Sequence, residues 1–143
     1  MHTLLTAIQD ILQNLPQLPR KSDCYVTPHV NYMPTGTRLP CLGLKDGGIN
    51  RAELAGEMAE LSMKVLLVGF VNMKTDGGKV MSEIYELLDD ATAMLVGADL
   101  GIAGMAGPDV GPDSPSEMFL ADNKQWIVKL VRTLTYTVDR ASA

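Results

Sequence analysis

The residues best suited to chemistry in this chain of 143 amino acids are two cysteines and two histidines. Cys24, His29 and Cys41 are close enough in sequence to suggest a metal site, because thiolates and imidazoles are preferred zinc ligands. However, the segment from Cys24 to Tyr32 alternates apolar and polar residues, and a strand with this spacing directs Cys24 and His29 to opposite faces. We therefore interpret the cysteines as core thiols and His29 as a surface imidazole, and we predict no metal and no cofactor.

Two glycine-rich segments match nucleotide-binding motifs only in part. Asp76-Gly-Gly-Lys79 is followed by Val80, where a phosphate loop needs a hydroxyl side chain to hold the metal ion. Gly101, Gly104 and Gly107 have the spacing of a dinucleotide fingerprint, which must open a helix, but Pro108 follows directly. We interpret the first segment as a turn before a helix and the second as a loop.

A general acid–base site would need carboxylates that face a partner. Glu83, Glu86 and Asp90 share one face of a predicted helix, but no histidine and no second acidic helix is predicted opposite them. No Gly-x-Ser-x-Gly motif occurs, and no serine or cysteine has a histidine partner that the sequence identifies. These patterns indicate a solvated acidic face and a protein that is not an enzyme.

The elements that must position these residues follow from hydrophobic periodicity. Helical spacing predicts helices from Leu4 to Leu15, before Pro16, and from Val80 to Leu95, before Gly97. Strands are predicted at Cys24–Tyr32 (at a sheet edge or bulged, because of Pro28), at Cys41–Leu44, at about Glu57–Asn72 and at Trp126–Arg140.

Between the second helix and the last strand, residues 97–123 are rich in glycine and proline and are predicted to form a long loop, with a short strand possible at Leu100–Ala103. Short turns between successive strands favour antiparallel pairing. We therefore predict one α+β domain over residues 1–143: a two-layer fold with a mostly antiparallel twisted sheet covered on one face by two helices.

Composition limits the class of protein further. Apolar residues make up 46% of the chain and charged residues 20%, which is typical of a globular domain. The net charge of −5 disfavours a general nucleic-acid binder. No targeting segment is evident, and the longest apolar run, Val65–Val71, is too short to span a bilayer, which predicts a cytosolic protein with reduced cysteines and no membrane partner.

The order of elements resembles one family. The opening helix, the strand ending Lys64-Val-Leu-Leu-Val-Gly-Phe-Val71, the helix beginning Lys79-Val-Met-Ser-Glu-Ile-Tyr and the closing Lys129-Leu-Val-Arg-Thr-Leu-Thr-Tyr-Thr-Val138 are similar to those of tail terminator proteins of long-tailed bacteriophages. These are also called tail completion or minor tail U-like proteins. The resemblance covers most of the chain in length and order.

The resemblance implies a structural virion protein at the head-proximal end of the tail, assembled in the host cytoplasm. Such a protein forms a ring, usually a hexamer, on the end of the tail tube, stops tube growth and offers a surface for the head–tail connector. DNA would pass through the lumen without specific binding. As contact residues we predict two loop tips, Lys45-Asp46 and the segment from Gly104 through Asp109 to Asp113, whose deletion should block tube attachment without unfolding the domain.

Two alternatives remain open at this point. A head-completion or connector-adaptor protein of the same virion would differ only in the surface that it binds. A small α+β ligand-binding domain or enzyme would have its pocket under the glycine-rich segment and would bind a small molecule as a monomer or dimer.

Overall fold

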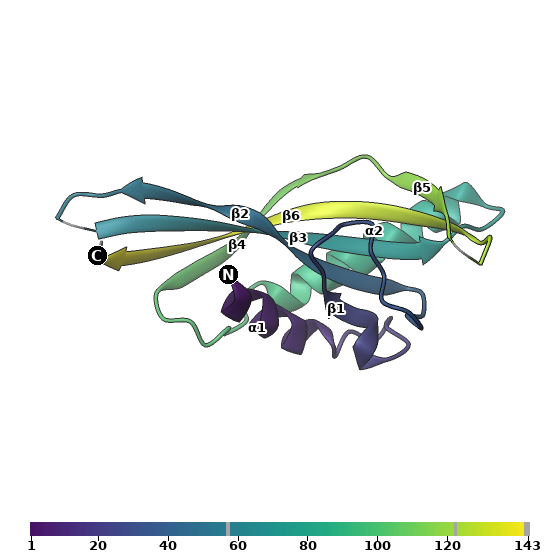
Figure 1. Cartoon of the computed structure of the whole chain (residues 1–143), viewed down its shortest axis with the longest axis horizontal. Helices are drawn as coiled ribbons and strands as arrows, with labels where there is room; N and C mark the ends of the chain where they lie inside the picture. Colours follow the sequence, from purple (N-terminus) through teal and green to yellow (C-terminus); the bar gives the residue numbers. More distant parts are fainter. Residues whose placement is uncertain (57, 122, 142–143) are drawn as a thin grey trace.

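The computed structural model describes residues 1–56, 58–121 and 123–141, with side chains in the last strand up to Asp139 (Figure 1). Its elements follow the chain as α1 (His2–Leu12), a short 3-10 helix (Lys21–Asp23), β1 (Cys24–Val26), β2 (Cys41–Glu53), β3 (Met58–Asn72), α2 (Gly77–Leu95), β4 (Met105–Asp113), β5 (Glu117–Leu120) and β6 (Trp126–Ala141).

The six strands form one sheet in the order β1-β2-β3-β6-β4, and β5 pairs with the first part of β6 beside β4. Only the pairing of β1 with β2 is parallel. The long strands β3 and β6 pair along the whole of β3, from Met58↔Ala141 to Asn72↔Ile127. The predicted α+β class with a mostly antiparallel sheet is therefore confirmed.

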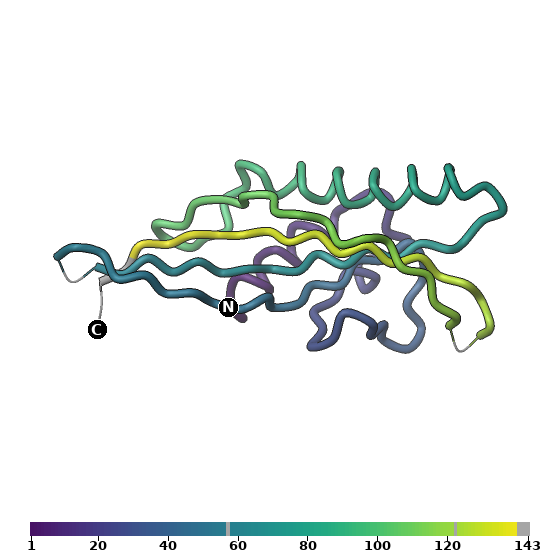
Figure 2. Tube along the Cα trace, turned by 90° about the horizontal axis from the view of Figure 1, so that it is seen from above, coloured from purple at the N-terminus to yellow at the C-terminus, as the bar shows by residue number. Residues whose placement is uncertain are grey.

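Both helices cover the same face of the sheet, as predicted, and Figure 2 shows α2 lying along it. The main core lies between them and alternate residues of the strands. These include Leu42 and Leu44, Val65 and Leu67, and Leu130 and Leu134, with Ile8, Leu12, Ile84, Leu87 and Leu88 from the helices. The period of two in the strands puts one side-chain set on this face and leaves the other set for the reverse face.

A smaller apolar cluster covers part of the reverse face. Tyr25, Cys41, Val68, Phe70 and Ile127 are buried there, and the ring of Phe119 from β5 meets Phe70 edge-on at 5.9 Å between centroids. The loop from Thr27 to Pro40 passes over this cluster. It is held by the buried carboxylate of Asp23, which accepts hydrogen bonds from the backbone N–H groups of Arg20 and Arg38. The sheet is thus covered on both faces at this end.

The largest departure from the predicted structure is in residues 97–123, which contain the strands β4 and β5 and no strand at Leu100–Ala103. The sequence pattern did not predict β4, because glycine and proline are depleted in regular strands. In the structure, the glycines and prolines of β4 lie at two irregularities in its pairing with β6. One falls between Ala106 and Asp109 and the other between Val110 and Asp113. Gly107 has φ +124°, and a Cβ there would lie 2.9 Å from the carbonyl oxygen of Thr135, so only glycine lets β4 approach β6.

Other boundaries also differ. α1 ends at Leu12, three residues early, and the predicted strand from Cys24 to Tyr32 extends only to Val26, although it does lie at the sheet edge. The predicted short strand at Cys41–Leu44 runs on to Glu53, because a bulge between Asp46 and Ile49 absorbs the two glycines that would otherwise end it.

The remaining elements are close to the prediction. β3 and β6 match their predicted strands, except that Glu57 lies outside the described residues. α2 begins at Gly77, where the Asp76 side chain caps it by accepting hydrogen bonds from the Gly78 and Lys79 N–H groups. Gly97, at φ +76°, follows its end. The turn predicted at Asp76–Lys79 is therefore a helix cap.

The hairpin of β2 and β3 projects beyond the helices at one end of the long axis (Figures 1 and 2). We call residues 45–54 and 58–64 the arm. Residues 46–53 of β2 are all exposed, because neither helix lies over them. The start of α2 and the strand β5 lie at the other end of the same axis.

Candidate interaction surfaces

Four of the five residues predicted as contacts fall on two separate strands, and the fifth precedes one of them. Lys45 and Asp46 lie in β2 at the base of the arm, with the Lys45 ammonium 3.5 Å from the Asp46 carboxylate. Gly104 precedes β4, and Asp109 and Asp113 belong to it. In the sheet order, β3 and β6 lie between β2 and β4, so the two groups are about 14 Å apart at ordinary strand spacing. The structure does not bring them together: Lys45, Asp46, Asp109 and Asp113 lie within strands, and Gly104 lies in the turn before β4.

Asp113 is engaged inside the molecule. Its carboxylate accepts two hydrogen bonds from the buried guanidinium of Arg132 on β6, from Nε at 2.8 Å and from Nη2 at 3.0 Å. The same guanidinium donates from Nη1 to Asp89 at 2.7 Å and to the Thr92 hydroxyl at 3.2 Å, both on α2. These hydrogen bonds raise the pKa of Arg132 above its already high value, so the cation is permanent. This cluster fastens β4 to β6 and α2.

The ion cluster corrects the expectation that residues 104–113 could be deleted from a domain that still folds. Deletion would remove the whole of β4 and leave Arg132, whose side chain is 8% exposed, without its bidentate partner. It would also uncover the edge of β6 between Arg132 and Val138, where β4 pairs. A buried cation without its partner destabilises a fold strongly, so this deletion cannot separate folding from attachment.

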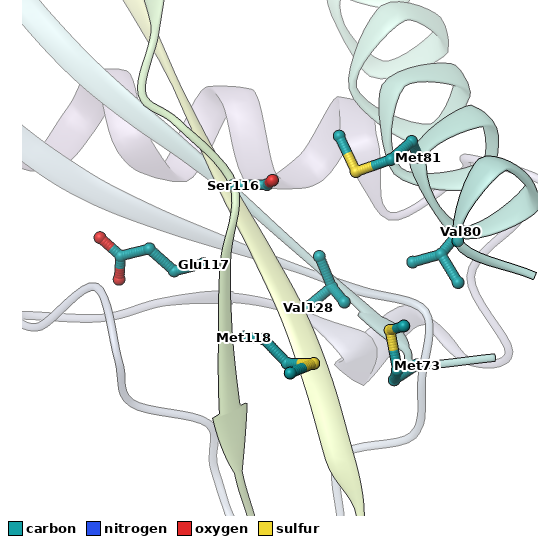
Figure 3. Close-up of a pocket in the computed structure, with 8 residues that line it drawn as sticks. Met73, Val80, Met81, Ser116, Glu117, Met118 and Val128 are labelled. Carbon is teal, nitrogen blue, oxygen red and sulfur yellow. The ribbon is translucent and has the colours of Figure 1, made fainter. Parts of the chain in front are cut away.

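A feature that the sequence did not reveal lies at the end of the molecule opposite the arm. A hollow of about 310 Å³ opens between the start of α2 and the strands β5 and β6 (Figure 3). We call it the methionine hollow; its lining residues are Met73, Gly77, Val80, Met81, Ser116, Glu117, Met118 and Val128.

The fold explains why apolar groups gather there. Met118 pairs with Val128 and Leu120 with Trp126 across β5 and β6, so these four side chains lie on the helix-covered face. Met73 adjoins them, since its N–H donates a hydrogen bond to the Trp126 carbonyl. α2 begins only at Gly77, and it leaves the other apolar side chains here, apart from Val128, exposed. The exposed fractions are 39% for Met73, 53% for Met118, 51% for Leu120 and 48% for Trp126.

This is a gathered apolar surface rather than isolated exposed residues, and it has the composition of a protein contact site. Methionine and tryptophan are enriched in the buried centres of protein interfaces. Methionine is flexible and polarisable, so a surface rich in it adapts to the partner's shape. The alternate positions of Met118 and Leu120 before Trp126 could have indicated a strand with an apolar face. They lie in a segment that the sequence analysis interpreted as a loop.

Two ion pairs involve residues at or next to the lining of the methionine hollow. Lys74 forms an ion pair with Glu83 of α2. Glu117 turns away from the hollow in Figure 3 and lies 3.1 Å from the buried ammonium of Lys129, on the reverse face of the sheet. The hollow therefore has an apolar floor, with the Lys74–Glu83 ion pair beside it.

The cysteine and histidine candidates do not converge. Cys24 is in the main core and Cys41 in the cluster on the reverse face, and burial raises the pKa of each thiol to about 12. His29 lies beyond the end of β1, not on it as predicted, and its Nδ1 accepts a hydrogen bond from the Asn31 N–H. Among the described residues, no three His, Cys, Asp or Glu side chains are grouped to hold a metal ion.

A smaller hollow of about 140 Å³ lies under residues 98–107, where the ligand-binding alternative places its pocket. Asp99 and Tyr136 are among its lining residues. The buried Tyr136 hydroxyl has no hydrogen-bond partner in the described part of the chain, and burial raises its pKa to about 12. Its volume is below the range of about 300–1,000 Å³ typical of small-molecule sites.

No protein-family model matches this sequence, and a search of curated proteins finds no significant match. Of the helices in the described residues, none is both long and apolar enough for a membrane span.

Proposed function

We propose that this protein is a phage tail terminator: a structural protein that forms a ring, as a hexamer, on the end of the tail tube. There it would stop tube polymerisation and present a surface to the head–tail connector. The observation that carries the proposal is the elongated domain with a projecting arm at one end and an exposed apolar hollow at the other. Unlike surfaces at opposite ends favour head-to-tail contacts, which form a ring when the rotation between successive copies closes and an open filament when it does not.

Electrostatics supports the same proposal. Six chains of net charge −5 would carry about −30 in total. An acidic ring does not retain phosphates by counterion release, so DNA can move through its lumen without specific binding. The proposed location is therefore the virion, at the head-proximal end of the tail, after assembly in the host cytoplasm.

The experiment is to measure the mass of the purified chain by light scattering and to image the same sample by negative-stain microscopy, with and without tail tubes. A ring of about six copies, formed alone or on tube ends, supports the proposal. A monomer or dimer that ignores tube ends refutes it.

The connector-adaptor alternative shares the ring and differs in its target. Binding assays with isolated tubes and with isolated connectors, at equal concentrations, separate the two. A terminator binds tube ends and limits tube length in a polymerisation assay, whereas an adaptor binds the connector and leaves tube length unchanged.

Tyr136 lines the 140 Å³ hollow, and its buried hydroxyl has no hydrogen-bond partner among the described residues, which favours the small α+β ligand-binding domain or enzyme as a second candidate. It predicts saturable binding of a small molecule by a monomer or dimer. Tyr136→Phe should remove that binding with little loss of stability, because it deletes a buried group that has no hydrogen-bond partner in the described part of the chain.

A further inference from the structure

The outer edge of β2 in the arm carries backbone groups that point away from the hairpin. The Leu54 N–H donates a hydrogen bond to the Met58 carbonyl, towards β3. Backbone groups of successive residues in an antiparallel strand point to alternate sides. Ala52 therefore faces β3 as Leu54 does, whereas Arg51 and Glu53 direct their N–H and C=O groups outward. These outward donors and acceptors are not used by the pairing with β3.

Among the described residues, no strand of this chain pairs with that edge. β1 pairs with β2 only from Leu42 to Leu44, before the bulge. Beyond the bulge the hairpin projects past the helices (Figures 1 and 2), and residues 46–53 are all exposed. Prolines and bulges protect many sheet edges from strand addition, but neither interrupts the segment from Ile49 to Glu53. The edge is therefore open to a strand from outside the chain.

The charges of this segment are complementary to those of a second copy in one antiparallel register. When Ala52 lies opposite Ala52 of the other copy, each Arg51 lies opposite a Glu53. A register centred on Arg51 or on Glu53 puts two like charges directly opposite each other, which is destabilising. A register centred on Asn50 brings Glu53 opposite Gly47, within the bulge, where regular pairing stops. The register centred on Ala52 is therefore the favoured one.

We propose that two copies of this chain pair through β2 of the arm, antiparallel, about a two-fold axis at Ala52. Each Arg51 then exchanges two backbone hydrogen bonds with Glu53 of the other copy, as in any hydrogen-bonded antiparallel pair, and their side chains form an ion pair. The axis crosses the arm where it projects, so the helices of the two copies lie on opposite sides of the contact. A two-fold contact closes after two copies and does not build a ring, so this inference goes beyond the proposed function and does not rest on it.

Charge reversal in separate copies tests the pairing. Arg51→Glu gathers only carboxylates at the contact, and Glu53→Arg only guanidinium groups. Each variant alone should therefore dimerise about tenfold or more weakly than the wild type, measured by light scattering over a series of concentrations. An equimolar mixture of the two should restore the dimer, because every acidic side chain then faces a basic one. Both variants lack the ion pair that Arg51 and Glu53 form within the chain, so mixing cannot restore an effect that acts through that pair.

Disulfide formation tests the register. Two Ala52 residues form a pair without backbone hydrogen bonds, with Cα atoms about 4.5 Å apart, so Ala52→Cys should give a covalent dimer under mild oxidation. Asn50→Cys is the matched control: it is exposed on the same face of β2, but two copies of it would lie about 14 Å apart and should not cross-link. Cys24 and Cys41 are buried with raised pKa values, so the native thiols should not react.

The outcomes separate this contact from the proposed ring. A wild-type chain that stays monomeric, single variants that dimerise as the wild type does, or a mixture that stays monomeric overturns the pairing. Equal cross-linking of Ala52→Cys and Asn50→Cys, or cross-linking of Asn50→Cys alone, overturns the register. If the wild type forms rings, the same contact joins two rings, and single rings without an Ala52→Cys cross-link overturn the pairing and leave the proposed function standing.

Discussion

The Asp113→Asn variant separates two interpretations of the same residue. The sequence suggested Asp113 as a contact with the tail tube or a neighbour, whereas the structure places it in a bidentate pair with Arg132. Asparagine keeps the shape but loses the charge and one of the two acceptor oxygens. Hydrogen bonds to charged groups contribute about 1.5–3 kcal/mol each when well formed. Asp113 is partly exposed, at 22% of its side chain, so we place the cost towards the lower part of that range, at about 2 kcal/mol.

A cost of about 2 kcal/mol corresponds to a fall in melting temperature of about 7 °C for a domain of this length. Urea unfolding followed by circular dichroism measures the free energy directly. Asp89→Asn is the matched control: Asp89 contacts the same guanidinium, but its side chain is 65% exposed, so its loss should cost less than about 1 kcal/mol. If Asp113→Asn unfolds like the wild type and yet fails to assemble, then Asp113 is a contact residue and the structural reasoning is wrong.

Three further predictions follow from the same packing. Gly107→Ala should lower the free energy of unfolding by about 2 kcal/mol or more, measured by urea unfolding, because the new Cβ would lie 2.9 Å from the Thr135 carbonyl oxygen at a positive φ. Stability should fall as pH rises from about 8.5 towards 12 under reducing conditions: the unfolded thiols ionise first, while burial holds the pKa of Cys24 and Cys41 near 12 in the folded state. Urea midpoints at pH 7, 9 and 10 test this, and Cys24→Ala should reduce the slope. Both thiols should react with a colorimetric thiol reagent only as fast as the domain unfolds; rapid reaction of the native protein would contradict their burial.

Periodicity was a sound guide wherever an element buries one clear face. Val80, Ile84, Leu87 and Leu88 recur along one side of α2, and the alternation through Leu130, Leu134 and Tyr136 identified β6. Where an element has no buried face, this signal is missing. The arm portion of β2 is exposed on both faces and contains Gly47 and Gly48, so composition alone suggested a turn.

The methionine hollow could not be foreseen for a different reason. Met73, Met81 and Met118 come from three separate segments, and only the register of β5 on β6 brings Met118 beside the start of α2. Their exposure depends on where the helix begins, which Asp76 fixes by capping. No pattern within a single segment carries that information.

The two outer edges of the sheet differ in a way that bears on assembly. The β4 edge contains Pro108 and Pro112, which have no N–H to donate, and it is interrupted by two irregularities of register. Such features prevent an edge from pairing with another strand. The arm portion of β2 contains no proline, and its register is regular from Ile49 to Glu53. The segment that the sequence favoured for contacts is therefore the one least able to add a strand, and the segment interpreted as a turn is the one with free backbone groups. If this chain assembles with itself by strand addition, its contacts should be disrupted by changes in the arm, and the exposed residues of β4 should tolerate substitution.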